Sequence, residues 1–275
     1  MRSASDAPAA AVAVRGVDIG YDGFAVQHDL DFEVAPGRVF VIMGESGCGK
    51  STLLHAMIGL LEPLRGDVLL HGVSLWQADD AERGRLLRRF GVLYQSGALW
   101  SSMTLSENVG LPLEEFTALT ASQVREMAAL KLALVGLAGF EDFYPSDISG
   151  GMRKRAGLAR AMALDPDILF LDEPSAGLDP VSARRLDDLI LELRDSFGCT
   201  VVVVTHELAS IFAIGDDAVY LDARSRTMTA RGNPRTLLAE STDPAVQAFL
   251  TRGGRQPRSG EGRDADTWPR ARAPR

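Results

Sequence analysis

The spacing of apolar residues predicts strands at the start of the chain, followed by a strand, a glycine-rich loop and a helix. Between residues 12 and 40, short β-rich stretches are broken by glycines, a pattern typical of a small antiparallel sheet. Residues 39–43 form a continuous apolar run of strand length, and apolar residues then recur at helical spacing over 52–60. Bounded apolar runs predict two further strands, at 66–72 and 90–95.

The spacing becomes mostly helical from about residue 105 to residue 164. Thr120 is followed three residues later by Gln123, which predicts a capping box at the start of a helix that runs to about Leu137. Residues 148–151 interrupt the helical spacing, which then resumes as far as residue 164. We therefore expect a helical subdomain inserted into an α/β core.

Alternation of strands and helices returns after this segment. Residues 167–171 predict a strand, and Pro180 suits the first turn of a helix that runs to about Ser196. The β-branched run at 200–204 predicts a buried parallel strand. A helix, two strands and a short helix are expected to complete the fold near Leu250.

The expected organisation is one α/β domain over residues 9–251, with the helical subdomain at about 104–164. Residues 1–8 are expected to be a flexible leader. Residues 252–275 are rich in arginine, glycine and proline and have no apolar period, which predicts a disordered tail.

Composition narrows the classes of protein. Of the 275 residues, 46% are hydrophobic and 24% are charged, as in ordinary globular proteins. The net charge of -8 argues against general nucleic-acid binding, because phosphate backbones are held by basic surfaces. Two cysteines suggest no disulfide framework, so a reducing compartment is expected. Because no apolar run is long enough to span a bilayer, work at a membrane would require spanning helices from another chain.

The loop after the apolar run at 39–43 fits the nucleotide-binding pattern G-x-x-x-x-G-K-[ST]. Its backbone N–H groups and the start of the next helix can surround a phosphate, and the candidate ligand-binding residues are Gly44, Glu45, Ser46, Gly47, Cys48, Gly49, Lys50, Ser51 and Thr52. Lys50 can reach the β- and γ-phosphates of a bound nucleotide, and the Ser51 hydroxyl can ligate Mg²⁺. A glycine turn without a ligand is the alternative, which the presence of both Lys50 and Ser51 disfavours.

Two further segments carry groups suited to phosphate chemistry. An apolar strand ends in Asp172 and Glu173. Asp172 can hold Mg²⁺ through water, and Glu173 can act as a general base on an attacking water. An acidic turn without function is the alternative, and the phosphate loop earlier in the chain argues against it. A second candidate anion site, or only a glycine break, lies at a helix start formed by Ser149, Gly150 and Gly151.

Taken in order, these motifs resemble the ATP-binding subunit of an ABC transporter over roughly residues 12–240. Residues 44–51 and 168–173 match the Walker A and Walker B motifs, 149–151 match the ABC signature, and 175–179 match the D-loop. The resemblance implies an α/β P-loop cassette. Such a cassette has an antiparallel β subdomain, a RecA-like parallel-sheet core and an inserted helical subdomain.

The resemblance also gives roles to three single residues. Gln95 matches the Q-loop glutamine, which would contact Mg²⁺ and relay to the membrane partner. His206 matches the switch histidine, which would contact the γ-phosphate and act with Glu173 in hydrolysis. Tyr21 stands where the family places an aromatic ring against adenine. Without the resemblance, Gln95 would be an ordinary polar residue at the end of a strand, His206 a histidine with satisfied hydrogen bonds, and Tyr21 a residue that only packs against its neighbours.

The signature departs from the commonest form, because Ile148 replaces leucine and Met152 replaces glutamine. Anion binding should survive, since Ser149 and the backbone supply it. The segments 149–155 and 95–99 are similar to ATPases of MCE-type lipid transporters. These include the Mla-like systems that move phospholipids between bacterial membranes, and related systems for sterols or other hydrophobic compounds.

The resemblance implies an ATP-hydrolysing subunit at the cytoplasmic face of the inner membrane, where it energises transport through a separate integral membrane permease. Two copies would pack head to tail as a homodimer, so that Ser149 of one chain closes on the ATP held by Lys50 of the other. An MCE-domain lipid-binding protein is a further expected partner, and nucleic acid is not.

Three alternatives stay open at this point. Within transporters, the alternative is the ATPase of an importer for amino acids or other small polar solutes. An ABC ATPase of ribosomes or DNA would usually carry two cassettes or a long coiled coil, whereas this sequence shows one cassette and no sustained heptad. A regulatory nucleotide-binding module would be favoured by a missing catalytic residue, but Lys50, Glu173 and His206 are all present.

Overall fold

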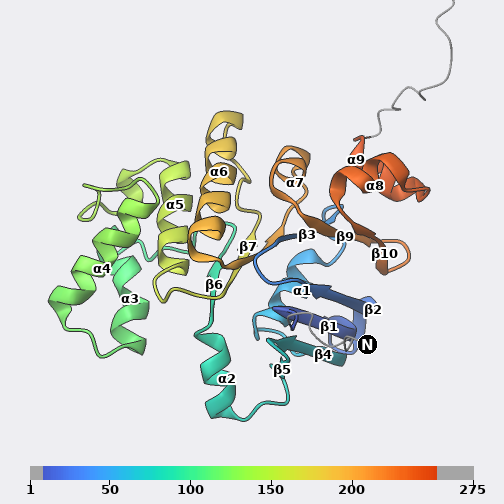
Figure 1. Cartoon of the computed structure of the whole chain (residues 1–275), viewed down its shortest axis with the longest axis horizontal. Helices are drawn as coiled ribbons and strands as arrows, with labels where there is room; N and C mark the ends of the chain where they lie inside the picture. The colour runs from blue at the N-terminus through green and yellow to red at the C-terminus, as the bar shows by residue number, and fades with distance from the viewer. Residues whose placement is uncertain (1–8, 253–275) are drawn as a thin grey trace, which may run out of the picture.

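The computed structural model describes residues 9–252, so the expected leader and the expected tail beyond Arg252 lie outside the described residues. The described chain consists of an antiparallel sheet, a mostly parallel sheet and a group of helices beside the second sheet (Figure 1). This arrangement confirms the α/β fold class expected from the sequence. Within residues 9–252, no helix is long and apolar enough to cross a membrane.

The smaller sheet has four antiparallel strands in the order β2-β1-β4-β5. They are β1 (Val12–Tyr21), β2 (Phe24–Val34), β4 (Arg65–Leu70) and β5 (Val73–Ser74). Asp22 and Gly23 join β1 to β2 with positive φ angles of 51° and 77°, as a two-residue hairpin turn requires. The predicted antiparallel sheet is therefore present, with β4 ending two residues before the expected position.

The larger sheet has six strands in the order β10-β9-β3-β8-β7-β6. The parallel strands are β3 (Val39–Gly44), β6 (Phe90–Leu93), β7 (Ile168–Asp172), β8 (Thr200–Val204) and β9 (Asp217–Asp222), and the antiparallel edge strand is β10 (Thr227–Gly232). Strands β3, β7 and β8 are buried along their whole length. Burial on both faces explains why they appear in the sequence as continuous apolar runs rather than alternating patterns.

The helical segment has an apolar core of its own. It contains α3 (Leu105–Phe116), α4 (Ala121–Leu134), the short 3₁₀ helix η1 (Pro145–Asp147) and α5 (Gly150–Ala161). The capping box predicted at Thr120 and Gln123 is present at the start of α4. Helix α4 ends three residues before the predicted Leu137, and α5 begins at Gly150 because Ser149 caps it.

Helices cover both faces of the larger sheet. Helix α1 (Lys50–Met57) shares one apolar core with both sheets, while α5 and α6 (Pro180–Phe197) pack on the opposite face. The chain then forms α7 (Leu208–Ile214), α8 (Pro234–Glu240) and α9 (Pro244–Leu250). The prediction of a single short helix at the end of the fold is wrong, because the chain forms two helices there. Helices α8 and α9 each have their own N-cap and leading proline. Helix α2 (Asp80–Leu87) was not predicted, because it buries only Leu86 and so shows no apolar period.

Gly91 of β6 provides a test of how closely the helical segment packs on the sheet. A Cβ atom at Gly91 would overlap the backbone carbonyl of Ala161 at the end of α5. We expect Gly91→Ala to lower the free energy of unfolding by about 1–3 kcal/mol, measured by urea denaturation.

Gly84 in α2 is the matched control, since a Cβ atom there has no heavy atom within 4 Å. Gly84→Ala should leave stability unchanged or raise it by about 0.5–1 kcal/mol, because alanine favours a helix over glycine. Equal effects of the two substitutions would contradict the close packing of β6 against α5.

Candidate nucleotide-binding and hydrolysis site

The parallel register brings four separate parts of the sequence to one edge of the larger sheet (Figure 1). Val204 of β8 pairs with Ile42 of β3 on one side and with Asp172 of β7 on the other. Leu93 of β6 pairs with Leu171. The segments that follow these strands are the phosphate loop, Glu173, His206 and Gln95, and they therefore emerge at the same edge.

The phosphate loop depends on glycine at positions where a side chain would clash. A Cβ atom at Gly44 would lie 2.5 Å from the Leu221 carbonyl oxygen. At Gly49, φ is 103°, a left-handed conformation that favours glycine, and α1 starts at the next residue. Glu45, Ser46 and Gly47 are exposed at the top of the loop. Their backbone is thus open to a ligand in front of a helix start, where N–H groups attract anions.

Lys50 lies back across the loop. Its ammonium group donates to the carbonyl oxygens of Gly44 and Glu45, each at 2.9 Å, and the residue is buried. An ammonium group has three N–H donors, so one donor is left for a phosphate oxygen. Cys48 is also buried, and burial raises the pKa of its thiol, which keeps it protonated and unreactive.

Ser51 and Asp172 form the candidate metal site. The Ser51 hydroxyl donates to the Asp172 carboxylate at 3.4 Å, and Thr52 next to it is half-buried. Burial, and secondly the charge of Glu173, raises the pKa of Asp172. A bound cation would offset both effects. Mg²⁺ is usually held by one or two carboxylates together with phosphate oxygens, so this donor set fits Mg²⁺.

Glu173 is held on both oxygens. The Nδ1 atom of His206 lies 2.7 Å from Oε1, and the Thr205 hydroxyl donates to Oε2 at 3.2 Å. The Glu173 backbone has φ of 46°, an uncommon left-handed conformation that persists only where surrounding contacts hold it. One such contact is the bond from the Glu173 N–H to the Val204 carbonyl at 2.8 Å. The carboxylate is therefore oriented before any substrate binds.

Lys154 is a functional candidate that the sequence analysis missed. Its buried ammonium group donates to the backbone carbonyl of Gln95 and, at 3.1 Å, to that of Glu173. Burial lowers the pKa of Lys154, while the carboxylates of Asp172 and Glu173 raise it. The lysine thus connects α5 to the exposed Gln95 and to the acidic strand end. In the sequence, Lys154 falls on the apolar face of the predicted helix, and a lysine at such a position was the signal that could have identified it.

Gln27 and Thr205 were also missed. Gln27 is fully buried in β2, and its amide donates to the carbonyl oxygens of Cys48 at 2.6 Å and Asp222 at 3.1 Å. It therefore holds the phosphate loop from the antiparallel sheet. A glutamine on an inward-facing strand position and a threonine directly before His206 were the available sequence signals.

The signature residues 149–151 lie away from the phosphate loop of the same chain. The Ser149 side chain accepts a hydrogen bond from the Met152 N–H at 3.2 Å, so it caps α5 while its own hydrogen is free to donate. Gly151 lies near Leu178 and Ser182 of a cavity that Ser149 also lines. The cavity beside the phosphate loop is a different one. Among the described residues, no hydrogen bond joins Ser149, Gly150 or Gly151 to the phosphate loop.

Tyr21 lies at the tip of the β1–β2 hairpin with half of its surface exposed. Phe24, its partner across the hairpin, is more exposed still, and the guanidinium group of Arg226 lies 4.9 Å from the Phe24 ring centre. An exposed aromatic pair of this kind can stack on a flat ring. Sequence analysis identified Tyr21 but not Phe24.

Comparison with known proteins agrees with this geometry. The family model for "ABC transporter" matches residues 27–176. The chain is 40% identical over 240 residues to the "Probable ribonucleotide transport ATP-binding protein mkl" of Mycobacterium leprae, covering 87% of this chain and 68% of that one. It is 37% identical over 239 residues to the "Intermembrane phospholipid transport system ATP-binding protein MlaF" of Escherichia coli, covering 87% and 88%.

Solved structures agree as well. A dimeric ATP-binding cassette in a post-hydrolysis state, bound to ADP and Pi, superposes with a TM-score of 0.73 at 29% identity, over 81% of this chain and 98% of that one. The chain spans about two thirds of the length of the mycobacterial relatives, 68% in one and 66% in another. The family match, the relatives and the geometry of the site agree. This chain belongs to the ABC transporter family and is an ATP-binding, ATP-hydrolysing subunit of that family.

Proposed function

We propose that this subunit hydrolyses ATP, with Mg²⁺, to drive a phospholipid or another hydrophobic compound through a separate membrane permease. The observation that carries the hydrolytic part is the position of Glu173. Its carboxylate is held by Thr205 and His206 beside Asp172, at the same sheet edge as the phosphate loop. A fixed carboxylate next to a phosphate site can take the proton of an attacking water.

Each expected site residue then has a role. The loop N–H groups and Lys50 hold the β- and γ-phosphates, and Mg²⁺ would be held by Ser51, Asp172 and Gln95 to neutralise phosphate charge. Tyr21 stacks on the adenine. Glu173 accepts the proton of the attacking water, and His206 orients Glu173 and contacts the γ-phosphate.

A second copy of the chain completes the site. Ser149 has a hydroxyl hydrogen free to donate at the start of a 12-residue helix, but it lines a cavity separate from the phosphate loop. In a head-to-tail homodimer, Ser149, Gly150 and Gly151 of one copy close on the ATP held by the other. The similar solved cassette is itself dimeric and bound to ADP and Pi, which supports this arrangement.

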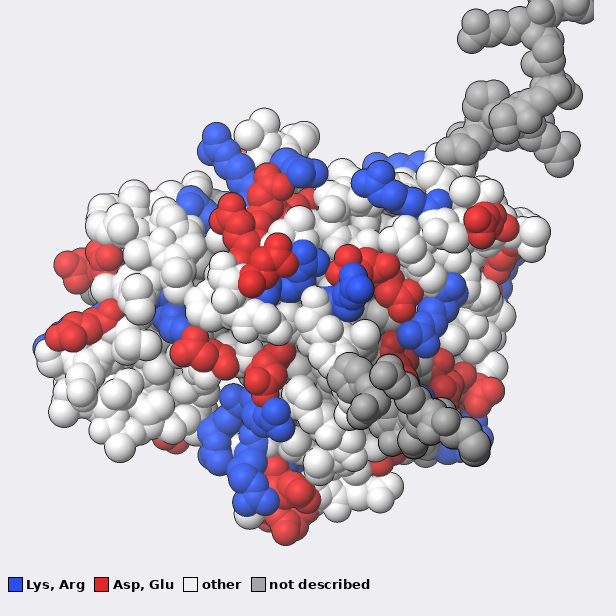
Figure 2. All heavy atoms as spheres, viewed as in Figure 1, with Lys and Arg blue, Asp and Glu red and all other residues white. Residues whose placement is uncertain are grey.

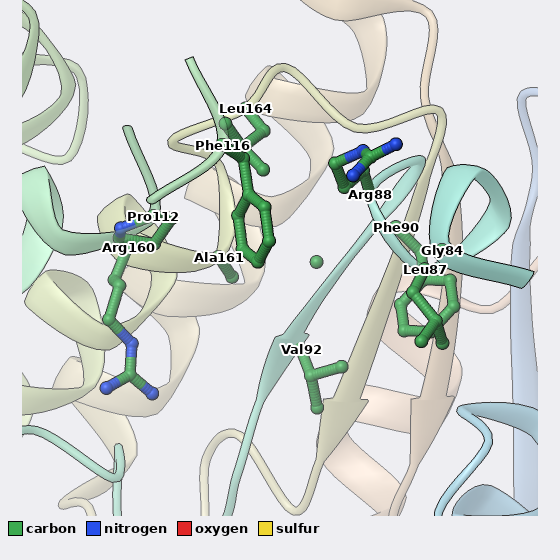
Figure 3. Close-up of a pocket in the computed structure, with 11 residues that line it drawn as sticks. Gly84, Leu87, Arg88, Phe90, Val92, Pro112, Phe116, Arg160, Ala161 and Leu164 are labelled. Carbon is green, nitrogen blue, oxygen red and sulfur yellow. The ribbon is translucent and has the colours of Figure 1, made fainter. Parts of the chain in front are cut away.

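The permease docks in an apolar groove beside the Gln95 strand. Figure 3 shows Phe116 on one side of the groove and Phe90 and Leu87 on the other. The cavity measures about 290 Å³, and half of the Phe116 surface is exposed. Strand β6 crosses the groove and ends two residues before Gln95, so an occupant would contact the strand that leads to the nucleotide.

The substrate class rests on relatives and on two short segments. One relative is named for phospholipid transport and the other for ribonucleotide transport. We favour a hydrophobic substrate because residues 149–155 and 95–99 are similar to those of MCE-type lipid transport ATPases. The permease then operates with an MCE-domain lipid-binding protein, and the ATPase works at the cytoplasmic face of the inner membrane.

Replacing Glu173 tests the hydrolytic role. Glu173→Gln removes the base but keeps the shape and the hydrogen bond from Thr205, so ATP binding and ATP-dependent dimerisation should remain. We expect kcat to fall by about 10²–10⁴-fold, measured as phosphate release. Wild-type turnover in this variant would remove Glu173 from the mechanism.

Mixing two inactive variants tests the shared site. Lys50→Ala and Ser149→Glu should each lose activity as homodimers, whereas a mixed dimer contains one site with both residues intact. Titrating one variant into the other should restore ATPase activity. If Ser149 acts within its own chain, the mixture will stay as inactive as its components.

Co-purification tests the permease and the substrate. A tagged chain extracted in mild detergent should bring a multi-pass permease, a single-span MCE-domain protein and phospholipid, all identified by mass spectrometry. Phe116→Asp should lose the permease, because it places a charge in the groove, but keep the ATPase activity of the free subunit.

Leu130→Asp on α4 is the matched control, since Leu130 is equally exposed and lies outside the groove. It should retain the permease. A permease recovered together with a soluble solute-binding protein would overturn the lipid assignment and favour the polar-solute importer.

A further inference from the structure

A buried carboxylate on α6 has no role in the site described so far. Asp187 is 3% exposed, and its Oδ1 atom has no hydrogen-bond partner among the described residues. Burying a polar atom without a partner destabilises a protein, so each such atom calls for an explanation. A neutral or apolar residue at this helix position would avoid the cost. The presence of an aspartate therefore points to a function.

Asp187 lines a cavity of about 250 Å³ between α6, α7 and the turn that follows β7. Ser210 of α7 and Ser175, from the turn after β7, line the same cavity and are both buried. Their hydroxyl oxygens are 3.3 Å apart. Ser175 follows Glu173 by two residues, and Ser210 follows His206 by four. The hydroxyl pair thus joins the two segments that carry the candidate catalytic groups.

An ionised Asp187 would give this hydroxyl pair a direction. Ser210 lines the same cavity as Asp187, and a carboxylate only accepts hydrogen bonds, so in a bond between the two groups the Ser210 hydroxyl would be the donor. The Ser210 oxygen is then left to accept from the Ser175 hydroxyl. A protonated Asp187 could donate instead, and the order of donors would no longer be determined.

We propose that Asp187 is a positioning residue for ATP hydrolysis, which acts through Ser210 and Ser175 to hold Glu173 and His206 in one relative arrangement. The inference rests on the proposed roles of Glu173 and His206. It adds a third element, α6, to the support of the Glu173 carboxylate. Among the described residues, no hydrogen bond joins Asp187 to the phosphate loop or to the candidate metal ligands.

The charged groups around the cavity are few. Arg184 and Asp188 lie on α6 itself and pair with each other at 3.0 Å, and Glu207 faces the cavity from the start of α7. Burial raises the pKa of Asp187 to about 6, against the lowering effects of Ser210 and Arg184. Asp187 is therefore ionised at pH 8 and mostly protonated at pH 5.

The experiment compares Asp187→Asn, Ser210→Ala and the double variant in steady-state ATPase assays. Each single change should lower kcat by about five- to tenfold, as expected for one lost hydrogen bond, and leave KM for ATP unchanged. The double variant should match the single ones, because all three break the same connection. Asp188→Asn is the matched control, with the same chemical change on the same helix outside the cavity.

The pH dependence separates positioning from stability. The ratio of wild-type to Asp187→Asn kcat should be largest at pH 8 and approach one below pH 6, where wild type carries a neutral carboxyl group. The native carboxyl binds its proton more tightly than the unfolded chain, so ionisation lowers stability as the pH rises towards and through about 6. Asp187→Asn should accordingly have the higher Tm at pH 8.

Several results would overturn the proposal. They are wild-type kcat in Asp187→Asn, a ratio that does not change with pH, additive losses in the double variant, or an equal loss in Asp188→Asn. Ser210→Ala keeps the test valid if Asp187→Asn fails to fold. An active Glu173→Gln variant would instead remove the proposed function and with it the role given to Asp187, whereas wild-type kcat in Asp187→Asn beside an inactive Glu173→Gln would overturn only the proposal for Asp187.

Discussion

The parallel alignment of β3, β8 and β7 is the constraint on which the site depends. Each strand is fully buried, and its polar residues can appear only where it leaves the sheet. Parallel strands all leave at the same edge. The register pairs Val204 with Ile42 and Asp172, so the phosphate loop, the acidic pair and His206 meet in space although they are spread over more than half of the chain. A shift of register in β8 would separate His206 from Glu173.

Around this edge, buried polar side chains connect the site to the rest of the molecule. Gln27 holds the phosphate loop from the antiparallel sheet, and Lys154 holds the Gln95 and Glu173 backbones from the helical segment. Hydrogen bonds between buried polar groups specify one arrangement more sharply than apolar packing does, although the Gln27 Oε1 atom has no partner among the described residues. The phosphate loop and the acidic pair are therefore each linked to a different part of the fold. A movement of the helical segment would be felt at Glu173 through Lys154.

The same structure fits the proposal that one chain forms only part of the complete site. Ser149 and the phosphate loop line separate cavities, and the groove at β6 shares no lining residue with either cavity. Nucleotide, second copy and permease can therefore bind at different surfaces. In the proposed homodimer, an ATP bound between two copies would stabilise only the closed state, so its binding energy could shift the equilibrium between closed and open states. Strand β6 offers a path from that equilibrium to the groove. Such an arrangement suits a subunit that converts ATP hydrolysis into motion of another protein.

The sequence alone determined the features that consecutive residues encode. The phosphate loop, the acidic strand end, the buried strands and the Thr120 capping box depend on short patterns of residue type, and the structure contains all four. Short helices such as α2 were missed because one buried leucine makes no period.

Only the tertiary structure decided which distant residues meet. The bonds from Gln27 to Cys48, from Lys154 to Glu173, and between Ser175 and Ser210 join different elements, and no local pattern specifies them. Their partners are set by strand order and helix packing, which arise from burial of the whole apolar core. For that reason the chemistry of this protein was visible in its sequence, whereas the contacts that orient it were not.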